Sequence, residues 1–398
     1  MIIYNNLKYD FNEFCMGFFD KLDLDLVLTC AGGVEKVLKS EVKRLTGEDF
    51  PVLDGELSLK GDGNLLAKLN LNLRTADRVF IKLGSFPVLS FDDLYDGVYA
   101  IDWKNILPKD AHVVVNGKCV KSKIFAISAC QSIVKKAIAT KMLGSSNSRL
   151  LETGSDYEIQ FRIFKDQCQI LLNTSGDGLH KRGYRDMVGI APIKETLASA
   201  LVLLSDFYYE RPFLDPFCGS GTIPIEATKI ALNIAGSKGR KFAFMDWKNF
   251  NPNFYKKSLE EALDGEKTDR KIEIFGSDID KKAIALSKRH LERAGLSGRV
   301  KFSVVDVNEQ KAILKDGTIV TNPPYGERVY DKMEAEACYR GLGKLVREAD
   351  NWSAFIITPH KGFEKNFGKR ADRTRKLYNS NVECNYYFYY KNKGANHD

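Results

Sequence analysis

Hydrophobic and polar positions follow two different patterns along this chain, and the pattern changes near residue 190. Before that point, an apolar run at residues 25–30 predicts a strand. The next segment predicts a helix, because its apolar side chains recur every three or four residues with charged residues opposite. That helical stripe consists of Val34, Val37, Leu38, Val42 and Leu45.

The mixture of helices and strands continues to residue 174. Helical spacing predicts helices at residues 63–71 and 127–143. A mixture of this kind favours an α+β binding module over a catalytic barrel. Short apolar runs predict strands at residues 55–60, 79–83, 111–118, 157–164 and 167–174.

After residue 190, apolar strands alternate with helices, of which the clearest covers residues 281–294. This alternation is typical of a parallel, doubly wound sheet with helices on both faces. The fold class of this half is therefore predicted as α/β. Its strands are predicted at residues 213–214, 272–276, 300–305 and 317–321.

Composition is that of an ordinary globular chain. Hydrophobic residues make up 44% and charged residues 28% of 398 positions, a length that favours two or three domains. No apolar run approaches the roughly 20 residues that a spanning helix needs. Acidic residues interrupt every apolar cluster of residues 1–23, so we expect no signal peptide and a cytoplasmic protein. A net charge of +8 favours a polyanionic partner only weakly and fits a solvated surface equally well.

Metal and disulfide chemistry are not expected. The eight cysteines stand apart with no CxxC pair, and only five histidines are available to complete a zinc site. A disulfide framework is equally unexpected in a chain of this size. The cysteines are therefore predicted to be reduced and mostly buried.

The strongest local signal is the segment from Asp215 to Thr222, directly after a predicted strand and before a helix. Its glycines allow a tight turn and the close approach of a ligand, and the helix offers free amides. A P-loop would need a lysine after Gly221, and a dinucleotide loop would need GxGxxG; neither pattern is present. The acid at Asp215 suits a cationic ligand such as S-adenosylmethionine. The alternative is that the glycines are merely structural.

Two further predicted strands end in acids. Asp278 follows one strand, where a carboxylate can accept hydrogen bonds from two ribose hydroxyls, and Asp306 follows the next, where it can accept from an adenine amino group. One such acid alone is often a helix cap or surface residue. Three at the carboxyl edge of one sheet favour a ligand site. The long separation of Asp215 from Asp278 predicts an insertion at residues 236–267.

The fourth strand runs into Asn322-Pro323-Pro324-Tyr325. Consecutive prolines cannot continue a ladder, so the backbone leaves the sheet in an extended, rigid form. The Asn322 side-chain oxygen and the Pro323 carbonyl can accept both N–H bonds of an exocyclic amino group, which turns its lone pair toward a methyl donor. Tyr325 can stack on the base. The structural alternative is a strand-ending turn with a packed tyrosine.

These motifs resemble those of a known family. Residues 215–222 resemble motif I of class I methyltransferases, and residues 322–325 look like the NPPY motif of amino-group methyltransferases. The chain as a whole is similar to THUMP-domain-containing RNA guanine-N2 methyltransferases, the 23S rRNA enzymes of the RlmL/YpsC type. The resemblance covers roughly residues 24–390. Further segments that carry it are residues 179–185, 191–200, 321–328 and 376–387.

The resemblance implies a Rossmann-like methyltransferase domain preceded by an α+β half that consists of a ferredoxin-like domain and an RNA-binding THUMP domain. It also implies S-adenosylmethionine as cofactor and methyl transfer to guanine N2, with 23S rRNA as partner and neither a metal nor a membrane. The expected divisions are an extension at 1–22, the ferredoxin-like domain at 23–66, the THUMP domain at 67–176, a linker at 177–190 and the methyltransferase domain at 191–398.

The family motifs also imply roles for individual residues. Asn322, Pro323, Pro324 and Tyr325 would hold the target guanine and carry catalysis. Asp278 and Ile279 would hold the ribose and flank the adenine, and Asp306 would bind the adenine amine. The expected cofactor-binding residues are Thr196, Asp215, Pro216, Phe217, Cys218, Gly219, Ser220, Gly221, Thr222, Asp278, Ile279, Asp306, Val307 and Asn322.

RNA capture is expected from basic residues with interleaved aromatics. The candidate clusters are one helix face, the segment after residue 178, and residues 361–376, although each cluster could instead be a solvated face. The residues expected to bind RNA are Lys135, Lys136, Lys181, Arg182, Tyr184 and Arg185, with Lys141 on the same helix face as the first two.

Several rival functions remain open at this point. NPPY also occurs in DNA adenine-N6 methyltransferases, and tRNA is an alternative RNA target. Protein glutamine-N5 methyltransferases use a similar motif but need no large RNA-binding half. An RNA-binding protein with a silent methyltransferase fold is a non-enzyme alternative, which the three strand-end acids disfavour. A THUMP-bearing thiouridine synthase is excluded, because no SGGxDS-type loop is present.

Overall fold

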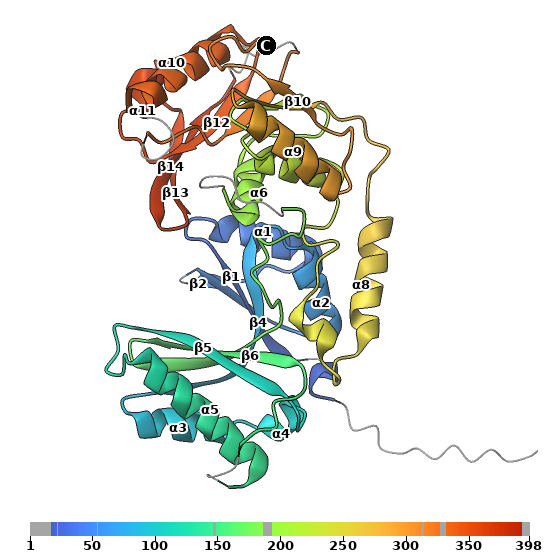
Figure 1. Cartoon of the computed structure of the whole chain (residues 1–398), viewed down its shortest axis with the longest axis vertical. Helices are drawn as coiled ribbons and strands as arrows, with labels where there is room; N and C mark the ends of the chain where they lie inside the picture. Colours follow the sequence, from blue (N-terminus) through green and yellow to red (C-terminus); the bar gives the residue numbers. More distant parts are fainter. Residues whose placement is uncertain are drawn as a thin grey trace, which may run out of the picture.

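The computed structural model describes residues 17–21, 23–53, 55–145, 149–185, 193–311, 314–326 and 332–391. Most of the expected N-terminal extension therefore lies outside the described residues, as do the end of the expected linker and the first residues of the expected methyltransferase domain. The described chain forms two seven-stranded sheets. They lie at opposite ends of an elongated molecule (Figure 1).

The N-terminal half contains a mixed set of helices and strands close to those that the sequence predicts. Helix α1 buries Val37, Leu38 and Val42, as the predicted stripe requires. The elements are η1 (Phe18–Asp20), β1 (Leu24–Cys30), α1 (Glu35–Thr46), β2 (Val52–Leu53), β3 (Glu56–Gly61), α2 (Gly63–Asn72), β4 (Ala76–Pro87), α3 (Phe91–Ala100), α4 (Trp103–Ile106), β5 (His112–Val120), α5 (Ile127–Leu143), β6 (Asp156–Phe164) and β7 (Gln167–Asn173).

One sheet joins the two expected N-terminal domains. Its strand order is β2-β3-β1-β4-β7-β6-β5, and only β5 and β6 pair in parallel. The long strand β4 pairs with β1 near its start and with β7 along its later part. The ferredoxin-like and THUMP parts therefore share a strand and a core, and the boundary expected at residue 66 falls inside α2.

The C-terminal half alternates strands and helices as predicted. Its elements are α6 (Glu195–Leu204), β8 (Phe213–Asp215), α7 (Thr222–Ala231), η2 (Ala243–Asp246), α8 (Pro252–Asp264), β9 (Ile274–Asp278), α9 (Lys281–Arg293), β10 (Lys301–Val304), β11 (Thr318–Thr321), α10 (Lys332–Glu348), β12 (Ser353–Thr358), α11 (Phe363–Phe367), β13 (Arg373–Asn379) and β14 (Val382–Tyr389). The strands β8, β9, β10 and β11 lie within two residues of the predicted ones at both ends, whereas β12 was not predicted.

The second sheet has the order β10-β9-β8-β11-β12-β14-β13. Its first five strands are parallel, and β14 and β13 add an antiparallel hairpin at one edge, so the sheet is mixed and not purely parallel as predicted. Alternate residues face opposite layers, because Val320 packs with α6, α7 and α9 while Ile319 packs with α10 and α11. Helices on both faces are therefore confirmed.

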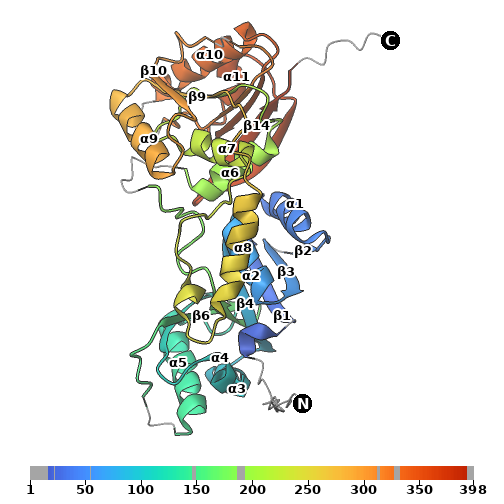
Figure 2. The same ribbon diagram turned by 90° about the vertical axis from the view of Figure 1, so that its right-hand side faces the viewer.

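The sequence predicts an insertion at residues 236–267, and the structure has one between α7 and β9 that reaches back to the N-terminal half. Helix α8 packs against α2, which Figure 2 shows side by side. The Trp247 ring stacks on Tyr157 of β6 with centroids 4.8 Å apart, and its Nε1 donates to the Asp156 carbonyl at 2.9 Å. Stacking of this kind adds about 0.5–1.5 kcal/mol beyond area burial. The insertion therefore fastens the two halves together.

Within the described part of the chain, no helix combines the length and the apolar character that crossing a membrane would require.

Candidate active site

The predicted site residues gather at one edge of the second sheet. Strand β8 ends at Asp215, β9 ends at Asp278, and β11 runs directly into Asn322. These strands are neighbours and parallel, so their carboxyl ends meet, as at ligand sites of open α/β sheets. The structure thus brings the cofactor loop and the NPPY motif together.

Asp215 is the most buried acid of the site, with a side chain 1% exposed. Its Oδ1 accepts hydrogen bonds from the Thr321 hydroxyl at 2.6 Å and from the Phe217 amide at 3.2 Å. Burial raises the pKa of the Asp215 carboxyl to about 7, which these neutral donors only partly offset. A nearby cationic ligand would stabilise the charged form, so the residue fits the predicted cofactor.

The loop after Asp215 turns tightly at two glycines with positive φ. A Cβ on Gly221 would lie 2.8 Å from the Cβ of Ser287, so only glycine fits there. A Cβ on Gly219 would meet no atom within 4 Å, which leaves open space beside the loop. The Gly219 amide donates to Asp278 Oδ2 at 3.0 Å. The loop is therefore shaped in advance and tied to the next strand end, with room for a ligand on its open side.

The other expected cofactor residues differ in accessibility. Burial raises the pKa of the Asp278 carboxyl, which also accepts from the Asp280 amide at 2.9 Å. Ile279 is 54% exposed beside it and could cover one face of an adenine. Asp306 Oδ1 accepts from the amide and the side chain of Asn308, and Val307 is buried. Pro216 and Cys218 are buried, whereas Phe217, Ser220 and Gly219 are partly exposed.

Asn322 and Tyr325 contact each other directly. The Tyr325 hydroxyl donates to Asn322 Oδ1 at 2.7 Å and accepts from Asn379 Nδ2 at 3.2 Å. Burial raises the pKa of the Tyr325 hydroxyl, so this group is neutral and a competent donor. The two predicted catalytic side chains therefore form one hydrogen-bonded unit. An asparagine oxygen has two lone pairs, so Asn322 can still accept from a substrate amine.

Three residues that support the site were not predicted from the sequence. Thr321 links the two motifs through its bond to Asp215. Tyr339 of α10 donates to the Pro324 carbonyl at 2.8 Å and so fixes the proline segment. His290 of α9 lies with Nδ1 3.0 Å from the Ser220 carbonyl. Only Thr321, next to the motif, had a signal in the sequence; the other two come from distant helices.

Thr196 lies in α6 and is buried near Asp77 of β4, whose carboxyl pKa is raised by burial and partly lowered by Thr196. Its position is therefore between α6 and the N-terminal half. Binding of the cofactor by Thr196 stays a prediction.

The expected RNA contacts at Arg182 and Tyr184 are wrong, because both side chains are buried. The Arg182 guanidinium donates to the Arg74 carbonyl and to the Ser237 hydroxyl. Its Nε also lies 4.0 Å from Glu226 Oε1. The Tyr184 hydroxyl donates to Glu226 at 3.1 Å. The Arg182 guanidinium therefore bonds acceptors of the protein itself and is too buried to contact RNA.

Arg240 of the insertion completes this buried cluster. Its guanidinium donates to the carbonyls of Ser175, Asp177, Gly178 and Lys181, so it fixes the path of the basic segment. Burial opposes ionisation of Glu226, but Lys229 and Arg182 outweigh it and lower the pKa of this carboxyl. We refer to Arg182, Tyr184, Glu226, Lys229 and Arg240 as the buried charged cluster.

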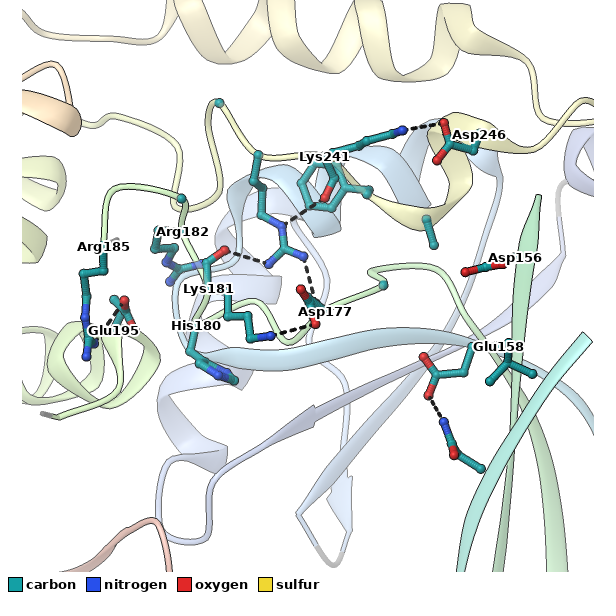
Figure 3. Close-up of a pocket in the computed structure, with 18 of the residues that line it drawn as sticks. Asp156, Glu158, Asp177, His180, Lys181, Arg182, Arg185, Glu195, Lys241 and Asp246 are labelled. Carbon is teal, nitrogen blue, oxygen red and sulfur yellow. Dashed lines mark hydrogen bonds and ion pairs between the residues drawn. The ribbon is translucent and has the colours of Figure 1, made fainter. Parts of the chain in front are cut away.

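A cleft of about 1290 Å³ separates the two halves beside this cluster. Figure 3 shows Arg185 paired with Glu195 on one wall and Lys181 paired with Asp177 in the middle. Arg185 also donates to the Ile193 carbonyl, so its charge is largely engaged within the protein. Lys181 is exposed and keeps access to the cleft.

The expected basic face of α5 is on the surface. Lys136 is exposed, whereas Lys135 forms an ion pair with Glu152 at 2.6 Å. The Lys141 ammonium lies 4.9 Å from the centroid of the Tyr99 ring. Among the expected RNA contacts, Lys136 and Lys181 are therefore the most accessible. RNA contacts of Lys135, Lys136, Lys181 and Arg185 stay predictions.

Comparison with known proteins agrees with this architecture. A family model described as "RMKL-like, methyltransferase domain" matches residues 182–387, an "RlmL ferredoxin-like domain" matches residues 25–80, and a "THUMP domain" matches residues 89–173. The Bacillus subtilis protein named "Putative RNA methyltransferase YpsC" is 40% identical over 92% of this chain and 95% of its own length.

Solved structures extend the likeness to three dimensions. SMU.472, crystallised with S-adenosylhomocysteine (SAH), is 37% identical with a TM-score of 0.89, over 93% of this chain and 99% of its own. A Listeria monocytogenes protein named "predicted N6-adenine-specific DNA methylase" is 40% identical with a TM-score of 0.88, over 93% and 96%. TrmN from Thermus thermophilus, at 16% identity and a TM-score of 0.68 over 92% and 99%, shares the fold.

The two sheets and the strand-end site define a methyltransferase that uses S-adenosylmethionine and carries a THUMP domain. The chain belongs to the RlmL-like family of THUMP-containing methyltransferases.

Proposed function

We propose that this protein is an RNA methyltransferase that transfers a methyl group to the exocyclic N2 of a guanine in 23S rRNA. The observation that carries the proposal is the Thr321–Asp215 hydrogen bond, which joins the NPPY strand to the cofactor loop in a chain with a THUMP domain. Guanine N2 and 23S rRNA rest on the family resemblance. We also propose a cytoplasmic location, because no disulfide joins the cysteines that the structure describes.

The residues at the ends of β8, β9 and β10 fit the cofactor. Asp215 and the open side of Gly219 would hold its methionine end, Asp278 and Ile279 would hold the ribose and adenine, and Asp306 would accept from the adenine amine. S-adenosylmethionine supplies an electrophilic methyl group on a good leaving group. The protein therefore needs to contribute mainly positioning and electrostatics.

The NPPY residues would orient the target amine. Asn322 Oδ1 and the Pro323 carbonyl would accept its two N–H bonds, which aims the nitrogen lone pair at the methyl group. The Tyr325 hydroxyl holds the Asn322 side chain in place, and Tyr339 fixes the proline segment through Pro324. Tyr325 would stack on the extruded base. The amine nitrogen would itself be the nucleophile and S-adenosylhomocysteine the leaving group, and the proton that the methylated nitrogen loses would pass to water.

RNA would reach the site across the cleft and the THUMP domain. Lys136 and Lys181 are accessible for phosphate contacts, and the cleft lies between the RNA-binding half and the catalytic half. Contacts of this kind weaken steeply with salt. The buried charged cluster would hold the two halves at a fixed spacing, so that RNA captured by one half reaches the other.

A DNA adenine-N6 methyltransferase is the second candidate. The observation that favours it is the name of the Listeria structure, which is 40% identical to this chain. An adenine N6 amino group would make the same two hydrogen bonds with Asn322 and Pro323. The THUMP domain favours RNA, and a tRNA target would use the same chemistry.

Transfer of a labelled methyl group to separate pools of rRNA, tRNA and DNA tests the proposal. We expect label in unmodified rRNA with the wild-type protein and none with the Asn322→Ala variant. Label confined to DNA would replace the proposal with the second candidate, and label confined to tRNA would correct the RNA. Equal transfer by wild type and variant would show that Asn322 has no catalytic role.

A further inference from the structure

A second pocket lies beside the catalytic motif, on the side away from the cofactor loop. Strand β11 has β8 on one side and β12 on the other. Because β11 and β12 are parallel, the loops that follow them meet at the same edge of the sheet. The loop at residues 359–362, together with α10 and α11, encloses a pocket of about 540 Å³ that Tyr325 and Gly326 border.

The pocket is lined by an excess of positive charge. Lys332, Lys361 and Lys365 are exposed and line it, and none of the three has an ion-pair partner among the residues that the structure describes. Glu336 also lines the pocket, with Oε1 3.6 Å from His360 Nε2. Two lysines that lie elsewhere in this half are instead paired with acids, Lys315 with Asp350 and Lys344 with Glu348. The three ammonium groups are thus arranged for an anion.

The wall of the pocket is linked to the catalytic motif. His360 Nδ1 accepts from the Gly362 amide at 3.1 Å, which fixes the loop after β12. The same ring packs edge-on against Tyr339 at 5.2 Å, and Tyr339 donates to the Pro324 carbonyl at 2.8 Å. The pocket therefore has a fixed position relative to the bond-accepting groups of Asn322 and Pro323.

We propose that this pocket binds a phosphodiester group next to the methylated nucleotide. The inference rests on the proposed function, in which the target base lies at the end of β11. A base that leaves its stack keeps its sugar and flanking phosphates, so the strand must run beside the base. Because the cofactor residues occupy the β8 side, the strand runs over the β12 side. Lysine ammonium groups suit phosphate contacts of this kind.

Binding of a fluorescent, guanine-containing single-stranded RNA of twelve nucleotides tests this pocket in the presence of SAH. The Lys361→Ala/Lys365→Ala variant should lose two contacts, each contributing about 0.7 to the salt slope of single-stranded binding. We expect the slope of log affinity against log salt to fall by about 1.4, and the affinity at 0.1 M salt to fall roughly 20-fold. The affinity for SAH and the thermal midpoint should not change.

The matched control is Lys315→Ala/Lys344→Ala, which removes the same charge from lysines that do not line the pocket. We expect it to change RNA affinity less than about threefold. Equal losses in the two double variants, or an unchanged salt slope in the pocket variant, would overturn the proposal.

Turnover separates this inference from the proposed function. In methyl-transfer assays, the pocket variant should raise KM for RNA and leave kcat nearly unchanged. RNA binding that depends on Lys361 and Lys365 without any transfer to RNA would contradict the proposed function and leave the pocket supported. Transfer to RNA that does not depend on Lys361 and Lys365 would support the proposed function and overturn the pocket proposal.

Discussion

Two groups of polar side chains in this molecule come from similar sequence signals but differ in their surroundings. One lies beside open space at a sheet edge, and the other is enclosed by the protein. At the carboxyl edge of the second sheet, Asp278 and Asn322 are only partly buried, and open space lies beside Gly219, whose amide bonds Asp278. In the buried charged cluster, Arg182 and Glu226 are enclosed and bonded to the protein itself. A charged motif therefore points to a ligand site where the fold leaves space beside it, as next to Gly219, and to a structural role where the protein's own groups enclose it.

The difference follows from position in the fold. A strand end at the carboxyl edge of a parallel sheet opens into a crevice, because the chain turns away there. The segment after residue 178 instead passes between two packed halves, where carbonyl groups of Leu73 and Arg74 need donors. The basic side chains supply these donors and lose contact with solvent.

The largest effect is expected from Glu226→Ala, which leaves Arg182 and Lys229 buried without their carboxylate. Breaking a buried ion pair costs about 3–5 kcal/mol, so unfolding should shift strongly to lower temperature or denaturant. The matched control Lys181→Ala removes an exposed charge and should change stability by less than about 0.5 kcal/mol. Calorimetry of both variants that gave equal midpoints would show that the cluster does not hold the halves together.

Asn322→Ala should lower the rate of methyl transfer and leave the stability of the fold nearly unchanged, the opposite of Glu226→Ala. Loss of one positioned hydrogen-bonding group typically lowers kcat about 10²–10³-fold, and the folded structure should tolerate the change because Asn322 is only partly buried. Single-turnover methyl transfer measures the rate, and titration with SAH measures binding, which we expect to stay within about threefold. Lost binding with normal transfer per bound cofactor would assign Asn322 to the cofactor alone.

A smaller effect is expected from the pH dependence of cofactor binding. Burial raises the pKa of Asp215 to about 7, so in the folded protein the carboxyl is protonated below that value and ionised above it. The unfolded carboxyl ionises at about pH 4 while the folded one stays protonated, so stability falls as pH rises from about 4 to 7. A cationic ligand that favours the ionised form offsets this loss. Affinity for SAH should therefore rise by at most about tenfold per pH unit up to pH 7.

The Asp215→Asn variant provides the control for this titration. Its affinity should be lower at pH 8 and nearly flat between pH 5.5 and 7.5, because the titrating group is gone. A wild-type profile that is equally flat would mean that Asp215 does not face the cationic end of the ligand.

The smallest effect is expected from single lysine substitutions on α5 of the THUMP domain, measured as RNA affinity. Lys136→Ala should reduce the salt slope of RNA binding by about 1 and the affinity by a few fold, since it removes one accessible charge. Lys135→Ala should do less, because Glu152 already neutralises that ammonium group. Anisotropy titrations at several salt concentrations can distinguish the two variants, and the reverse order would place RNA on a different face of α5.

Features set by local sequence were predictable. The ends of β8, β9 and β11 and the burial pattern of α1 followed from apolar periodicity and turn residues. The position of Asp215, Asp278 and Asn322 at one edge followed from the rule that parallel strands end together. The insertion was visible in the unusual distance between two strand ends.

Features set by long-range packing were not predictable. The sequence shows that residues 179–185 are basic, but not that Arg240, from the insertion, holds that segment against the N-terminal half. The hairpin of β13 and β14 adds antiparallel strands through pairing that no local pattern specifies. Tyr339 and His290 support the site from helices whose packing determines where they point.

The central claim is that the accessible strand-end group, and not the buried one, performs chemistry on an RNA base. Mass analysis of nucleosides from rRNA treated with the wild-type protein and S-adenosylmethionine tests it most directly. We expect N2-methylguanosine as the product of the wild-type protein and none with the Asn322→Ala variant. N6-methyladenine in treated DNA, with no methylated nucleoside in the RNA, would contradict it.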